Sequence, residues 1–79
     1  MEITHAFGIT IRKLRNEKGL TQEGLGFEAD LRRTFVSTLE LGQKQPTLAT
    51  IFKLSIGLGI KPSKLIELVE LELEDSAKL

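Results

Sequence analysis

Four breaks, at Gly19, at Asp30 and over residues 42–46 and 57–62, divide this chain into five short segments, and each segment fits a helix better than a strand. In the first segment, Phe7, Ile11 and Leu14 follow the i, i+4, i+7 pattern of one helix face. The expected helices cover about residues 4–18, 22–28, 32–41 and 62–75, and another lies between Thr47 and Gly59. The pattern therefore predicts an all-α protein.

Two threonines stand where helices are expected to begin. Thr21 is a good N-cap residue, and the apolar residues Leu20 and Leu25 flank it at the positions of a hydrophobic staple. Thr47 follows a proline and precedes the next apolar periodic run. Pro62 suits the first turn of the last helix, because a helix start does not need its missing N–H.

The last segment, residues 62–75, is apolar over more than half of its helical circumference. This breadth predicts two buried faces, one against its own domain and one against a partner. Residues 69–74 also alternate strictly between apolar and acidic, which is a strand pattern. The leucines and glutamates favour a helix, and a short strand that pairs across a dimer stays open as the alternative.

Length and composition limit how such a chain can be stabilised. A chain of 79 residues makes one domain, residues 1–79, with a small core. It has no cysteine and one histidine, which excludes disulfides and thiolate or histidine-rich zinc sites and leaves oligomerisation as the usual stabilising device. No apolar run approaches the ~20 residues of a membrane span, and no signal peptide is visible. We therefore expect a cytoplasmic protein with no membrane partner.

Residues 21–41 have the organisation of a helix-turn-helix motif, two short helices joined by a brief turn. The flanking motifs are LTQE at 20–23, LRRTFVS at 31–37, LE-x-G at 39–42, PTL at 46–48 and LGI at 58–60. In this order they resemble the Cro/C1-type (XRE) helix-turn-helix family over about residues 11–66. The resemblance implies a compact five-helix bundle that acts as a bacterial or phage transcription regulator and dimerises on palindromic DNA operators.

In this family's motif the second helix enters the major groove of DNA, and its first residues meet the base edges. The corresponding residues here are Arg32, Arg33 and Thr34, together with Thr38 one turn later. By its position Arg33 is the expected principal base reader, because an arginine can donate two hydrogen bonds to one guanine. Arg32 has two alternatives, a base or a phosphate.

The resemblance also implies contacts to the DNA backbone and one structural ion pair. Gln22 lies beside the free N–H groups of a helix start, which favour a phosphate. The expected backbone contacts are Thr21, Gln22, Ser37, Gln43, Lys44 and Gln45. The structural pair is Arg15 with Glu40, which would hold the reading helix against the scaffold. Three phenylalanines, Phe7, Phe27 and Phe52, are expected in the core.

The last helix is expected to supply the dimer contact through five apolar residues. They are Leu65, Leu68, Val69, Leu71 and Leu73. We therefore expect a homodimeric, autoregulatory regulator of the repressor type. The LRRTFVS block is similar to that of controller proteins of restriction–modification systems. An antitoxin-like protein that neutralises a partner and binds DNA secondarily is the alternative. We expect no enzyme, catalytic residue, metal, cofactor or small-molecule ligand, because no nucleophile–base set or glycine-rich phosphate loop is present.

The formal net charge is zero, but the charges are unevenly placed. Residues 31–46 hold three cations and one anion, and that anion is the glutamate of the expected structural pair. Residues 66–79 hold five anions and one cation. A small basic edge opposite an acidic tail predicts weak non-specific binding to DNA, so base contacts must supply much of the selectivity.

Overall fold

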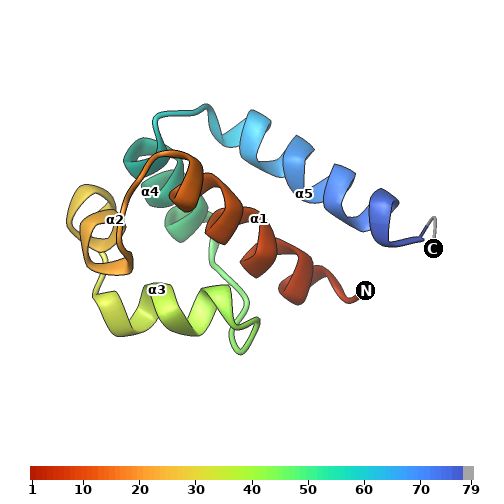
Figure 1. Ribbon diagram of the computed structural model, residues 1–79, viewed down its shortest axis with the longest axis horizontal. Helices are drawn as coiled ribbons and strands as arrows, with labels where there is room; N and C mark the ends of the chain where they lie inside the picture. The colour runs from red at the N-terminus through yellow and green to blue at the C-terminus, as the bar shows by residue number, and fades with distance from the viewer. Residues whose placement is uncertain (78–79) are drawn as a thin grey trace.

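The computed structural model describes residues 1–77 and contains five α-helices joined by short loops (Figure 1). The helices are α1 (Ile3–Glu17), α2 (Gln22–Ala29), α3 (Arg33–Glu40), α4 (Leu48–Leu58) and α5 (Pro62–Ala77). No strand occurs within these 77 residues, so the all-α prediction is confirmed. Residues 69–74, whose alternation also fits a strand, are helical and belong to α5.

Side-chain caps explain where three of the helices begin. The Thr21 hydroxyl accepts a hydrogen bond from the Gly24 amide at 2.9 Å. The Thr47 hydroxyl caps α4 in the same way, so both predicted threonine caps are confirmed. At α1 the Glu2 carboxylate accepts from the Thr4 amide at 2.7 Å, and this hydrogen bond lowers the pKa of Glu2. The first helix therefore begins slightly earlier than predicted.

The helix α1 lies at the centre of the arrangement. It packs against α3 on one side and α5 on the other, while α2 packs against α3 and α4. Figure 1 shows α3 along the lower edge of the view and α5 along the upper edge, with α1 between them. A ligand that binds the outer surface of α3 would therefore lie on the opposite side of the molecule from α5.

All five helices contribute to one apolar core. Its buried residues are Ala6, Phe7, Ile11, Leu25, Ala29, Val36, Leu39, Leu54, Leu58, Leu65 and Val69. A glycine permits the tight turn between α2 and α3, since a Cβ atom at Gly26 would stand 2.6 Å from the carbonyl oxygen of Leu31. The core and this turn together fix the outer face of α3 relative to α2.

Two of the three phenylalanines that were expected in the core lie on the surface. Phe7 is 4% exposed, as predicted, but Phe27 is 84% exposed and Phe52 is 51% exposed. In α2 the side chain of Leu25 takes the inward position, and in α4 that of Leu54 does so. The prediction for Phe27 and Phe52 is therefore wrong, because the inward faces of these helices are set by other residues.

Candidate nucleic-acid interface

Three residues predicted to contact bases form the beginning of α3. Arg32 occupies the N-cap position with extended backbone angles, φ −73° and ψ 145°, and Arg33 is the first helical residue. Both arginines and Thr34 are exposed to solvent. Neither guanidinium has an acidic partner within residues 1–77. Their hydrogen-bond donors therefore remain free for a ligand at this helix start.

The same side of α3 continues with two short hydroxyl side chains. Ser37 and Thr38 are half-buried, so their side chains are less accessible to a ligand than that of Thr34. The Thr38 hydroxyl donates a hydrogen bond to the Thr34 carbonyl at 2.9 Å. With this hydrogen used inside the helix, Thr38 can offer a ligand its methyl group and an oxygen lone pair. The contact predicted between Thr38 and a base can therefore be an apolar contact of the methyl group or a hydrogen bond that the Thr38 oxygen accepts.

A buried ion pair ties α3 to α1. The Arg15 Nε atom donates to Glu40 Oε2 at 2.6 Å, and Arg15 Nη2 donates to Glu40 Oε1 at 3.1 Å. The side chains of Arg15 and Glu40 are only 12% and 3% exposed. The hydrogen bond to Glu40 raises the pKa of Arg15, so the guanidinium stays charged. The predicted structural pair is thus present, in the bidentate geometry that is strong and directional.

Two further hydrogen bonds extend this pair to α2. Arg15 Nη1 donates to the Leu20 carbonyl at 2.8 Å, at the approach to α2. The side-chain amide of Gln22, the first residue of α2, donates to Glu40 Oε1 at 3.1 Å. Sequence reasoning assigned Gln22 only to the DNA backbone and missed this second role. No local signal marks it, because Gln22 and Glu40 are 18 residues apart.

The loop that follows α3 holds the remaining predicted backbone contacts. Gln43, Lys44 and Gln45 are all exposed, and the loop leaves the helix through Gly42 with a φ of +71°. Lys44 has no ion-pair partner within residues 1–77. Leu41 precedes this loop and is 60% exposed. This loop therefore lies at the C-terminal end of α3, and the two arginines lie at its N-terminal end.

Two of the five residues predicted for a dimer contact are buried within the chain itself. Leu65 is 0% exposed and Val69 is 5% exposed, and both belong to the core cluster. Leu73 is half-buried and packs against the same cluster, and Leu68 is also half-buried. The prediction is therefore wrong for Leu65 and Val69, because their side chains hold α5 to its own domain. Leu71 remains 45% exposed.

The surface that sequence reasoning missed lies on α4. Leu48, Phe52 and Ile56 stand at intervals of four residues and are 71%, 51% and 76% exposed. This spacing places them on one face of the helix. We call this set the α4 row. Its spacing is visible in the sequence, but its exposure depends on which face α4 turns toward the core.

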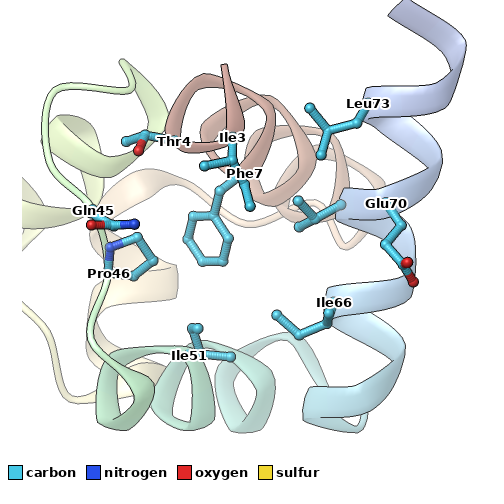
Figure 2. Close-up of a pocket in the computed structure, with 10 residues that line it drawn as sticks. Ile3, Thr4, Phe7, Gln45, Pro46, Ile51, Ile66, Glu70 and Leu73 are labelled. Carbon is cyan, nitrogen blue, oxygen red and sulfur yellow. The ribbon is translucent and has the colours of Figure 1, made fainter. Parts of the chain in front are cut away.

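An apolar hollow lies beside α4, between α1, α5 and the loop that precedes α4. Figure 2 shows the ring of Phe7 at its centre, with Ile51 of α4 and Ile66 of α5 below and Pro46 of the loop to one side. Its volume is about 170 Å³. Gln45, one of the predicted DNA-backbone contacts, also lines this hollow. The surface next to α4 is therefore open and apolar.

The arrangement supports binding by many hydrogen-bond donors. Its exposed groups are the guanidinium groups of Arg32 and Arg33, which have no acidic partner within residues 1–77, the Thr34 hydroxyl and the side-chain amides of Gln43 and Gln45. Residues 1–77 hold no group of three or more metal-binding side chains. In the same part of the chain, no helix is both long and apolar enough to span a membrane.

Comparison with known protein families matches most of this chain to one family. A family model described as Helix-turn-helix matches residues 11–65. This range includes the two helices of the motif, the structural pair and the loop after α3. It agrees with the resemblance seen in the sequence motifs.

Two relatives in this comparison are named as control proteins. Control protein C.MunI from a Mycoplasma species is 40% identical over 72 residues, which cover 90% of this chain and 97% of that protein. Control protein C.BamHI from Bacillus amyloliquefaciens is 40% identical over 62 residues, covering 77% and 76% of the two chains. Both names describe control proteins, and neither describes an enzyme.

Solved structures show the same architecture. The restriction–modification controller protein C.AhdI from Aeromonas hydrophila matches with a TM-score of 0.76 and 42% identity, over 78% of this chain and 94% of that one. The wild-type controller protein C.Esp1396I matches with a TM-score of 0.87 and 27% identity, over 95% and 97% of the two chains. This chain belongs to the XRE-type helix-turn-helix family of DNA-binding transcription regulators.

Proposed function

We propose that this protein is the controller of a restriction–modification operon, which it regulates by binding a palindromic operator as a homodimer. One observation carries the proposal: two exposed arginines, with no acidic partner among residues 1–77, begin a helix that the ion pair of Arg15 and Glu40 ties to α1. The names of the relatives, control and controller proteins, support the subfamily.

Recognition would start at Arg33. A guanidinium can donate two parallel hydrogen bonds to the O6 and N7 atoms of guanine, which is worth about 1–3 kcal/mol of discrimination. Arg32, at the N-cap, lies where it can reach a neighbouring base or a phosphate. The Thr34 hydroxyl and the Thr38 methyl group would complete the contacts in the groove.

Contacts to the DNA backbone would flank this helix on both sides. Thr21 and Gln22 lie at the start of α2, where free backbone N–H groups favour a phosphate. Ser37 on α3, with Gln43, Lys44 and Gln45 in the loop, would contact phosphates at the other end of α3. Such contacts set the register of α3 in the groove without selecting a sequence themselves.

A homodimer would place two copies of α3 in successive turns of the major groove, about 34 Å apart. The α4 row is the face that we assign to the dimer. Leu48, Phe52 and Ile56 form an exposed apolar surface, and Ile51 of the same helix lines the apolar hollow. Leu71 of α5 is exposed as well, whereas the buried Leu65 and Val69 have no part in this contact.

Dimerisation would also make control of the operon depend on concentration. Because two monomers must associate to occupy a palindrome, operator occupancy rises steeply as the protein accumulates. A protein that binds upstream of its own gene would then regulate its own synthesis. This mode of control would act through the amount of protein and without a small-molecule ligand.

Fluorescence anisotropy with labelled DNA from upstream of the gene tests the proposal. We expect the unmodified protein to form a specific complex at moderate salt and Arg33→Ala to lose it. Lys64→Ala is the matched control, because it removes one exposed cation from α5, on the far side of the molecule. Equal binding by Arg33→Ala and the unmodified protein would remove the basis of the proposal.

A further inference from the structure

Glu40 is the most connected polar side chain of the motif. It is the last residue of α3, is 7% exposed, and accepts three hydrogen bonds through its two carboxylate oxygens. Two of them come from Arg15 on α1, and the third comes from Gln22 on α2. One buried carboxylate therefore joins three helices.

The bond from Gln22 fixes which way its amide group faces. A carboxylate can only accept hydrogen bonds, so the Gln22 NH₂ group, and not its oxygen, must point toward Glu40. That NH₂ group has a second N–H, for which residues 1–77 provide no hydrogen-bond acceptor. Gln22 is half-buried and is the first residue of α2, a position at which a helix has free backbone amides.

Arg15 allows this arrangement to operate next to DNA. Unpaired, a carboxylate near the phosphate backbone would repel it. The charge of Glu40 is matched by the guanidinium of Arg15 at 2.6 Å, and both groups are nearly buried. The amide of Gln22 is thus oriented by a carboxylate whose charge is compensated.

We infer that Glu40 is a positioning residue for DNA binding: it orients the Gln22 amide so that the free N–H meets one phosphate of each half-site. The inference rests on the proposed function and adds a coupling to it. The same carboxylate ends the helix that begins with Arg33, so the phosphate contact on α2 and the base contact on α3 share one anchor.

Operators carrying single methylphosphonate substitutions test this coupling, because each substitution removes the charge of one phosphate. In the unmodified protein we expect one position per half-site where substitution weakens binding about tenfold, through loss of a hydrogen bond to a charged group. Gln22→Met and Glu40→Asp should bind the unsubstituted operator more weakly and show no further loss at that position. Lys44→Ala, the control, should keep the full tenfold loss there.

The result that overturns the inference is specific. A folded Glu40→Asp protein that keeps the tenfold loss at that phosphate would show that Glu40 does not position Gln22. The same conclusion follows if Gln22→Met still loses binding tenfold when the charge of that phosphate is removed. Failure of the proposed function is a separate result, in which the unmodified protein selects no operator and Arg33→Ala changes nothing.

A second measurement needs no change at Glu40 and so does not depend on the folding of that variant. In a 15N spectrum, with the signals assigned from Gln22→Met, the Nε2 proton of Gln22 that is bonded to Glu40 should be shifted away from the position it has in the exposed Gln43 of the free protein. One proton should stay in place when operator is added, since it remains bonded to Glu40, and the other should shift. Gln22 amide signals that match those of the exposed Gln43 in the free protein would overturn the inference.

Discussion

A Cβ atom added at Gly8 of α1 would stand 2.6 Å from the carbonyl oxygen of Glu40 at the end of α3. The Leu39 carbonyl oxygen would lie closer still. Real Cβ atoms essentially never come within 3.0 Å of such a neighbour, so α1 and α3 meet this closely only because residue 8 is a glycine. The same approach brings Arg15 of α1 within bonding distance of the Glu40 side chain.

Gly8→Ala should therefore destabilise the fold, although alanine is the better helix former. The methyl group must push α3 away from α1, and overpacking of this kind costs about 1–3 kcal/mol. Gly24→Ala is the control, since its Cβ would meet the Thr21 hydroxyl at 3.2 Å and no backbone atom. Urea unfolding followed by circular dichroism measures both variants. Equal stability of Gly8→Ala and the unmodified protein would contradict the close packing.

The buried ion pair gives the second prediction. Removing one partner leaves a buried charge without compensation, so Arg15→Leu and Glu40→Leu should each lower the free energy of unfolding by about 3 kcal/mol. The double variant, with both residues changed to leucine, should recover part of this loss. Denaturant unfolding of the four proteins measures the coupling. Additive losses in the double variant would show that the two side chains do not stabilise each other.

Arg33 and Lys44 should affect DNA binding in different ways. Arg33→Ala should reduce the preference for operator over a mismatched site, because it removes a base contact worth about 1–3 kcal/mol. Lys44→Ala should weaken binding to both DNAs alike and reduce the slope of log affinity against log salt by about 1. Titrations at several salt concentrations separate the two effects. A preserved preference in Arg33→Ala would contradict its assignment as a base reader.

Two exposed phenylalanines offer a matched test of the dimer face. Phe52 belongs to the α4 row, whereas Phe27 lies on α2, and both are at least half exposed. Phe52→Ser should therefore shift the protein from dimer to monomer, and Phe27→Ser should leave its association unchanged. Sedimentation equilibrium at micromolar concentration measures both. If Phe52→Ser remains as dimeric as the unmodified protein, the dimer forms through another face.

Much of the fold was predictable because its signals are local. Thr21 and Thr47 cap their helices as expected, and the breaks at Gly19, at Asp30 and over residues 42–46 fall between the helices that the structure contains. The Arg15–Glu40 pair was predictable in another way, through a resemblance that matched both residues to a structural pair of the family. Period, caps and breaks each depend on residues a few positions apart, so one sequence suffices to predict them.

Orientation toward the core was less predictable. The helix α5 is apolar around most of its circumference, so its sequence does not say that Leu65 and Val69 face inward. The predictions for Phe27 and Phe52 were wrong for a related reason, since smaller or neighbouring residues take the inward positions of α2 and α4. The Gln22–Glu40 hydrogen bond joins two helices, and only their packing brings these side chains together.

Selection of binding sites from a random duplex library is the most direct test of the central claim, that a dimer reads DNA through the start of α3. The account predicts an inverted repeat whose half-sites are about 34 Å apart, with a guanine in each half that Arg33→Ala no longer selects. Enrichment of an asymmetric site, or of the same sequence by Arg33→Ala, would contradict it.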